Sequence, residues 1–116
     1  MKIKIFSLLL LSFLALTSVK NGEIAPSFSL LNQDNENVSL DQFKGKKIIL
    51  EWTNHDCPFV KRHYDTENMQ NIQKDMTDNE VVWLSIISSA KGKQGYVTKD
   101  QAKELTTKRN APPTHV

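Results

Sequence analysis

Residues 47–64 read KIILEWTNHDCPFVKRHY, and the rest of the fold depends on this junction. Residues 47–53 form an apolar run rich in β-branched side chains after a Gly-Lys pair, which predicts a strand buried on both faces. A short polar loop leads to Cys57 and Pro58. Proline suits the first position of a helix, because its missing N–H has no intrahelical partner there. The sequence therefore predicts a strand, a loop and a helix that begins directly after the cysteine.

Further elements extend this pattern toward the C-terminus. The helix is predicted over residues 58–75, with a kink or restart at Asp65-Thr66, because its apolar residues only roughly follow a 3.6-residue period. A second buried strand is predicted at residues 81–87. Another helix follows over residues 98–110, opened by a capping box of Thr98 with Gln101. Alternating strands and helices indicate an α/β domain with parallel pairing and right-handed crossovers.

The ends of the domain show weaker signals. A short N-terminal β-hairpin is predicted around a turn at residues 33–35, followed by a helical turn capped by Ser39 and ended by Gly45. Residues 114–116 look like the start of another strand. A central sheet usually has about four or more strands, and only two long buried strands are evident here. We therefore expect a domain at residues 20–116 that is incomplete at its C-terminus, and a chain that is a fragment.

Residues 1–19 have the composition of a signal peptide. Lys2 and Lys4 precede an apolar run at residues 5–16, and small residues follow it. Twelve residues at about 1.5 Å each are too short for a bilayer core of about 30 Å, so no stable membrane span is expected. The sequence predicts export, with the protein periplasmic or extracellular after cleavage. An uncleaved anchor is the alternative.

The charge of the chain depends on that segment. The full sequence has 15 Lys and Arg against 13 Asp and Glu, and loss of Lys2 and Lys4 leaves 13 of each. A mature domain without net charge gives no indication of a nucleic-acid surface, which would need clustered basic residues on one face.

Cys57 is the only cysteine in the sequence, so no internal disulfide can form. At the first turn of a helix, unpaired backbone N–H groups and the helix dipole favour a thiolate over a thiol. Lys61, Arg62 and His63 add positive potential nearby, whereas Asp56 opposes ionisation if its carboxylate faces the sulfur. A thiolate is the nucleophile that attacks peroxides and disulfides. Cys57 is therefore the predicted catalytic residue, and a buried, inert cysteine is the alternative.

Two other interpretations concern the neighbours of Cys57. His55, Cys57 and His63 could bind copper or zinc, but the spacing matches no familiar zinc pattern and three ligands fall short of the usual four. No metal and no cofactor is therefore predicted. The aromatic side chains in and after this stretch are expected in the core; they are Trp52, Phe59, Tyr64 and Trp83.

Several motifs together resemble the redoxin group, which includes the alkyl hydroperoxide reductase/thiol-specific antioxidant proteins. They are Ala25-Pro26-x-Phe28-x-Leu30, Phe43-x-Gly45-Lys46, the turn Asp56-Cys57-Pro58-Phe59-Val60, and the downstream segment from Ser88 to Tyr96. The turn is similar to that of exported, thioredoxin-like redoxins. The resemblance implies a thioredoxin-like fold and the reduction of peroxides or disulfides.

The chain departs from the family at two places. Thioredoxin-type reductases carry Cys-x-x-Cys, and here Val60 occupies the second position. Peroxiredoxins carry Pro-x-x-x-Thr/Ser-x-x-Cys, and here Leu50 and Asn54 stand at those places, with Thr53 adjacent. We therefore expect a one-cysteine antioxidant oxidoreductase acting on a small-molecule peroxide or a protein disulfide, with an external thiol as reductant. The alternative is a thioredoxin-fold binding module that does not react.

Overall fold

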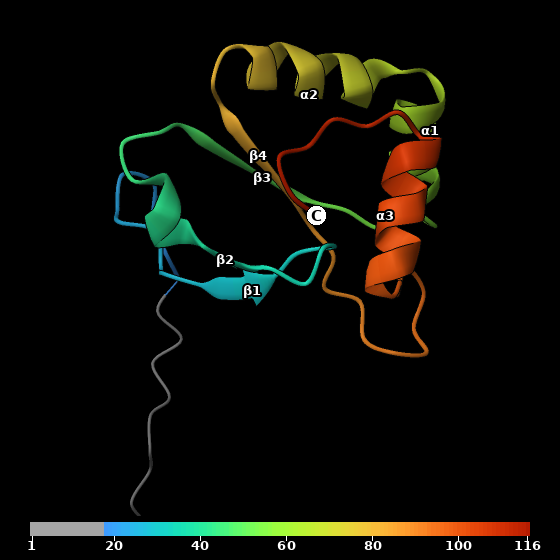
Figure 1. Cartoon of the computed structure of the whole chain (residues 1–116), viewed down its shortest axis with the longest axis horizontal. Helices are drawn as coiled ribbons and strands as arrows, with labels where there is room; N and C mark the ends of the chain where they lie inside the picture. Colours follow the sequence, from blue (N-terminus) through green and yellow to red (C-terminus); the bar gives the residue numbers. More distant parts are fainter. Residues whose placement is uncertain (1–17) are drawn as a thin grey trace, which may run out of the picture.

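The computed structural model describes residues 18–116, and its elements follow the predicted order (Figure 1). They are β1 (Ser29–Leu31), β2 (Asn37–Ser39), the 3-10 helix η1 (Leu40–Phe43), β3 (Ile48–Trp52), α1 (Pro58–Asp65), α2 (Asn68–Asp78), β4 (Val82–Ile86) and α3 (Lys99–Lys108). All but the last two residues of the predicted signal peptide lie outside the described residues. None of the helices in residues 18–116 has the length and apolar character of a membrane span.

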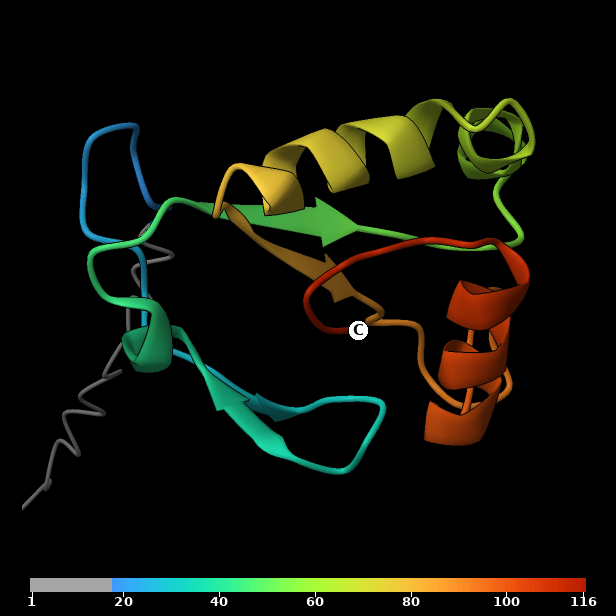
Figure 2. The same cartoon turned by 45° about the horizontal axis from the view of Figure 1, so that its top comes forward.

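The strands form two separate pairs. β1 and β2 make the predicted antiparallel hairpin, with Ser29 opposite Ser39. β3 and β4 pair in parallel, with Ile48 opposite Val82 and Trp52 opposite Ile86, and the chain crosses between them through α1 and α2. In both views α2 lies over one side of the β3–β4 pair and the hairpin lies on the other side (Figures 1 and 2). This arrangement confirms the predicted α/β class.

β4 also contacts the C-terminal segment. Leu84 and His115 form a parallel bridge, the Ser85 N–H donates to the His115 carbonyl at 3.0 Å, and the Thr114 N–H donates to the Trp83 carbonyl at 2.8 Å. β4 therefore lies between β3 and this segment, which explains why four of its five residues are buried. The predicted further strand is present as a single bridge.

The prediction that β3 is buried on both faces is wrong. Leu50 is 40% exposed and Trp52 is 65% exposed, so Trp52 is not the core residue that was expected. Side chains alternate along a strand, and Glu51 points toward α1 and α2, where it contacts Tyr64. Leu50 and Trp52 therefore face the opposite side, which the described residues leave partly uncovered.

The helices begin and end close to their predicted positions. The predicted helix over residues 58–75 is two helices, separated at Thr66 and at Glu67, whose φ of 59° is left-handed, and α2 continues to Asp78. Both predicted caps are present, with full capping boxes at Ser39 and Thr98. The boundaries differ by a few residues because the polar residues of α2 carry little apolar periodicity.

Candidate functional site

Cys57 is the N-cap residue of α1, at the end of the loop that follows β3. Its side chain is partly exposed and its thiol is free. The Cys57 N–H donates to the Asn54 carbonyl at 3.0 Å, and the Cys57 carbonyl accepts from the Lys61 N–H at 2.9 Å. Pro58 occupies the first helical turn as predicted, and the Cys57 side chain makes no capping hydrogen bond. The residue thus lies at the positive end of the helix dipole with its sulfur not used as a cap.

Residues 53–57, called the Cys57 loop below, are held by their own hydrogen bonds. The Thr53 N–H donates to the Ile86 carbonyl at 3.0 Å, which continues the β3–β4 pairing by one residue. Asn54 then accepts twice, since its Oδ1 receives the Asp56 N–H at 2.9 Å and its carbonyl receives the Cys57 N–H. An asparagine that bonds the backbone two residues on makes a compact turn. Asn54 therefore sets the direction in which the chain enters α1.

The Asp56 carboxylate is bound from two sides. Its Oδ1 lies 3.3 Å from Nε2 of His55, and its Oδ2 accepts from the Gly95 N–H at 3.2 Å. The His55 side chain is 24% exposed and the Asp56 side chain 51% exposed. Both carboxylate oxygens of Asp56 thus have partners, and one of them comes from a segment about 40 residues further along the chain.

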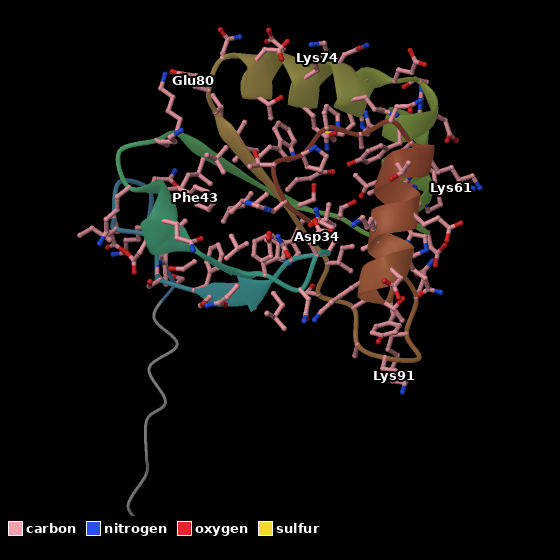
Figure 3. All side chains as sticks on the ribbon, in the orientation of Figure 1. Asp34, Phe43, Lys61, Lys74, Glu80 and Lys91 are labelled. Carbon is pink, nitrogen blue, oxygen red and sulfur yellow. The ribbon has the colours of Figure 1, made fainter. Side chains whose placement is uncertain are left out.

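The basic residues of α1 lie at the surface. Lys61, Arg62 and His63 are all exposed, and Figure 3 shows Lys61 on the outer side of the molecule. Nδ1 of His63 lies 3.0 Å from Nδ2 of Asn68 in a hydrogen bond. Salt screens exposed charges over about 8–10 Å. These residues therefore raise the positive potential around the start of α1 without being fixed against the sulfur.

The structure does not assemble His55, Cys57 and His63 as ligands. Within residues 18–116 there is no group of three or more His, Cys, Asp and Glu side chains placed to hold a metal ion. His55 is paired with Asp56, and His63 is paired with Asn68. The metal-binding interpretation of this stretch therefore has no geometric support.

Glu51 forms a hydrogen-bond network that the sequence interpretation missed. Its Oε1 accepts from the Tyr64 hydroxyl at 2.9 Å, and its Oε2 accepts from three donors. These are Nε2 of Gln73 at 3.0 Å, Nε1 of Trp83 at 2.9 Å and Oγ of Ser85 at 3.0 Å. The network joins β3, β4, α1 and α2 beneath the helix that starts at Cys57. Its one signal in the sequence is an acid inside the apolar run at residues 48–52.

Tyr64 and Arg109 link this network to the Cys57 loop. Burial raises the pKa of the Tyr64 hydroxyl, and the negative charge of Glu51 and the hydrogen bond to it raise that pKa further. The Arg109 guanidinium stacks 4.4 Å from the centre of the Tyr64 ring, and its Nη2 donates to the His55 carbonyl at 3.4 Å. A single basic residue at the end of a helix gives no sequence signal, so only the fold reveals this contact.

The surface next to Cys57 is apolar. Phe59, two residues after Cys57, is 79% exposed, and the neighbouring Pro58 is also exposed. The expectation that Phe59 belongs to the core is therefore wrong, whereas Tyr64 and Trp83 are buried as predicted. Phe59 lies in the first turn of α1, and the described residues leave most of its side chain uncovered.

Thr53 does not replace the missing peroxiredoxin hydroxyl at the surface. Its Oγ1 is fully buried and has no hydrogen-bond partner among the described residues. It lines a cavity of about 30 Å³ together with His55, Tyr64 and Arg109. A hydroxyl in this position does not meet a molecule that approaches Cys57 from solvent.

Comparisons with known proteins give a family and a fold. The family model described as Redoxin matches residues 20–111. Among solved structures, the chain is similar to a thiol:disulfide interchange protein from Bacteroides sp., with a TM-score of 0.62 and 15% identity over 84% of this chain. It is also similar to BsSco, described as a member of the Sco family of cytochrome c oxidase assembly proteins, with a TM-score of 0.55 and 23% identity over 76% of this chain.

A third similar structure is a thioredoxin family thiol:disulfide interchange protein from Chlorobium tepidum TLS, with a TM-score of 0.52 and 20% identity over 77% of this chain. The structural similarity to these proteins shows that the chain has the thioredoxin-like fold. The chain spans 59%, 48% and 55% of the lengths of these three proteins. No curated protein sequence matches the chain.

Proposed function

This chain belongs to the Redoxin family, and on that premise we propose that it is a thiol-dependent oxidoreductase that works through a single reactive cysteine, Cys57. The observation that carries the proposal is the place of Cys57, partly exposed at the N-cap of α1. The helix dipole favours an ionised sulfur there. The only cysteine of the sequence therefore has both the electrostatic support and the access to solvent that a nucleophile needs.

The proposed reaction is the reduction of a disulfide. The Cys57 thiolate attacks one sulfur of the substrate, a new S–S bond forms to Cys57, and the substrate's own S–S bond breaks. The second substrate sulfur leaves with the electron pair and takes a proton from water. An external thiol then attacks Cys57 and releases the first substrate sulfur. A second external thiol frees Cys57 and leaves the reductant as a disulfide.

The substrate class is a disulfide within a polypeptide. Phe59 and Pro58 give Cys57 an exposed apolar border, which a polypeptide covers and a small peroxide does not. The buried Thr53 hydroxyl leaves a peroxide without an evident polarising donor on that side. Two of the similar structures are thiol:disulfide interchange proteins, which agrees with this choice.

The direct test uses the purified domain with a disulfide-bonded protein and glutathione. We expect the domain to speed the reduction of the protein disulfide and to form a trappable mixed disulfide at Cys57. Cys57→Ser is expected to abolish both, and Phe59→Ser to slow the protein reaction more than the reaction with a small aromatic disulfide. Equal rates with and without the domain would contradict the proposal. A Cys57→Ser variant that still supports the biological role would favour the binding module instead.

Peroxide reduction, the antioxidant activity expected from the sequence, stays a prediction. Attack of the Cys57 thiolate on a peroxide oxygen would form a sulfenic acid and release water or an alcohol, and an external thiol would then condense with the sulfenic acid. A sulfenate-trapping reagent after limiting hydrogen peroxide measures this step. Capture no faster than with a free thiol would restrict the activity to disulfides.

We also propose that the domain works after export, on the residue pattern of residues 1–19. Oxidising compartments outside the cytoplasm are where protein disulfides persist, which fits the proposed substrate. Cell fractionation followed by N-terminal sequencing tests this. We expect an extracytoplasmic protein that begins between residues 18 and 21, and an intact Met1 in the cytoplasm would contradict it.

A further inference from the structure

The segment between β4 and α3, residues 88–97, contacts the Cys57 loop through Gly95. Gly95 is buried and has a φ of +80°, a conformation that favours glycine. Its N–H donates to Oδ2 of Asp56 at 3.2 Å. A Cβ built on Gly95 would lie 2.4 Å from Cγ and Oδ1 of Asn54 and 2.6 Å from its Nδ2. Any side chain at Gly95 would therefore have to move Asn54.

Asn54 cannot move without disturbing the turn before Cys57. Its Oδ1 holds the Asp56 N–H at 2.9 Å, and its carbonyl holds the Cys57 N–H at 3.0 Å. Gly95 thus touches two members of the Cys57 loop in different ways. It donates a hydrogen bond to Asp56, and it leaves the space that Asn54 occupies.

We propose that Gly95 is a positioning residue for Cys57, acting through Asp56 and Asn54. The inference rests on the proposed function, in which Cys57 reacts as a thiolate. Adjacent Cα atoms are about 3.8 Å apart, so the Asp56 charge lies near Cys57 and disfavours a second negative charge on the sulfur. The Gly95 N–H donates to one carboxylate oxygen and His55 Nε2 lies 3.3 Å from the other, and together they hold the carboxylate in one place. Gly95 thereby keeps Asp56 from suppressing the ionisation of Cys57.

Other charged groups surround this contact. The charged and titratable side chains come from the loop itself and from three neighbouring segments. They are His55 in the loop, Lys61, Arg62 and His63 on α1, Lys91 and Lys93 in residues 88–97, and Arg109 next to α3. Of these, His55 pairs with Asp56, and Arg109 donates to the His55 carbonyl. The other side chains are exposed, so the effect of any charge on them is expected to weaken with salt, whereas the Gly95 hydrogen bond is not expected to weaken. High ionic strength therefore weakens the effect of these more distant charges more than that of the Asp56 carboxylate on the adjacent residue.

The experiment measures how fast iodoacetamide alkylates the protein between pH 4 and pH 10 in 0.5 M salt. Cys57 is the only cysteine, so all thiol alkylation reports on it, and mass spectrometry separates it from alkylation of methionine. Gly95→Ala is expected to raise the pH of half-maximal rate by about half a unit, as for an uncompensated neighbouring carboxylate. Gly92→Ala is the matched control. Gly92 lies in the same segment with a φ of +78°, and nothing stands within 4 Å of a Cβ there.

A double variant tests whether the effect passes through the Asp56 charge. Asp56→Asn keeps an acceptor for the Gly95 N–H but removes the charge, so it is expected to lower the pH of half-maximal rate. If Gly95 acts through that charge, Gly95→Ala added to Asp56→Asn shifts this pH no further. A shift of the same size in both backgrounds would overturn the proposal, as would equal behaviour of Gly95→Ala and Gly92→Ala.

Asn54→Ala provides a second route if Gly95→Ala fails to fold. It removes the acceptor of the Asp56 N–H without placing a side chain at a left-handed position, and it is expected to shift the alkylation profile in the same direction as Gly95→Ala. No shift for Asn54→Ala would overturn the proposal. Alkylation needs no substrate disulfide, so a loss of disulfide reductase activity in the parent protein would count against the proposed function and leave this measurement intact.

Discussion

Glu51 is the residue whose role the amino-acid pattern conceals most completely. A carboxylate inside an apolar strand normally costs stability unless its oxygens are hydrogen-bonded. Here four donors from three different elements meet it, and one of them, Gln73, is fully buried. Removing the acceptor would leave the buried indole of Trp83 and the buried hydroxyl of Ser85 without a partner among the described residues, which is costlier than losing a bond between exposed groups.

We therefore expect Glu51→Ala to lower the free energy of unfolding by about 3 kcal/mol, from buried donors left unsatisfied at roughly 1–3 kcal/mol each. Urea unfolding followed by tryptophan fluorescence measures the change. Glu104→Ala, at an exposed position of α3, is the control and should change stability by less than about 0.5 kcal/mol. A loss for Glu51→Ala no larger than for the control would show that the network adds nothing to stability.

Among the elements, the break between α1 and α2 illustrates how backbone conformation divides one polar stretch. α1 ends at Asp65, and Glu67 adopts a left-handed conformation with φ of 59° before α2 begins. α1 thus carries Cys57 at its N-cap, while α2 packs over β4 (Figure 2). A non-glycine residue in this conformation costs about 1–2 kcal/mol, so the break is maintained by the packing on either side of it.

Glu67→Gly is accordingly expected to raise the free energy of unfolding by up to about 1 kcal/mol, because glycine adopts this φ without the Cβ clash, although its unfolded chain is more flexible. Lys61→Gly, at an exposed position in the interior of α1, is the paired control and should lower stability by about 0.5–1 kcal/mol. Thermal melting distinguishes the two variants by the sign of the change in Tm. Changes in Tm of the same sign for both variants would contradict the prediction that the left-handed conformation of Glu67 is strained.

At the scale of the whole molecule, Tyr64 links the site to global stability. Its hydroxyl bonds Glu51 and accepts from Gln73, its ring stacks against Arg109, and its side chain is buried. Burial, together with Glu51, raises the pKa of Tyr64 in the folded protein. The unfolded chain releases this proton near pH 10. Above that pH the folded state binds more protons than the unfolded state, so stability falls as the pH rises.

Tyr64 should therefore contribute its full stability below about pH 10 and lose it progressively above that pH. We expect Tyr64→Phe to be less stable than the parent by about 1–3 kcal/mol at pH 7, because Glu51 and Gln73 lose a partner. This difference should narrow between pH 10 and pH 11. Urea unfolding across this range measures it, with Tyr96→Phe, at an exposed tyrosine, as the control. A constant difference would contradict the predicted linkage.

Much of the fold and part of the site follow from sequence alone. The order of strands and helices, Pro58 at the start of α1, the Ser39 cap and the Thr98–Gln101 capping box depend on neighbours within a few residues, and these predictions are confirmed. The predicted break at Asp65-Thr66 is confirmed, whereas the end of α2 lies at Asp78 and not near residue 75, because its polar residues carry little apolar periodicity. The catalytic role of Cys57 and the signal peptide stay predictions.

Local chemistry was enough to place a lone cysteine after a strand and before a proline-led helix, since capping, chain direction and apolar periodicity are all written within a few residues. Local chemistry did not predict the contacts between distant segments. The pairing of Asp56 with Gly95, the stacking of Arg109 on Tyr64 and the exposure of Trp52 depend on which faces meet once β3, β4 and α3 are assembled. These features depend on residues that are tens of positions apart in the sequence, so only the three-dimensional arrangement decides them.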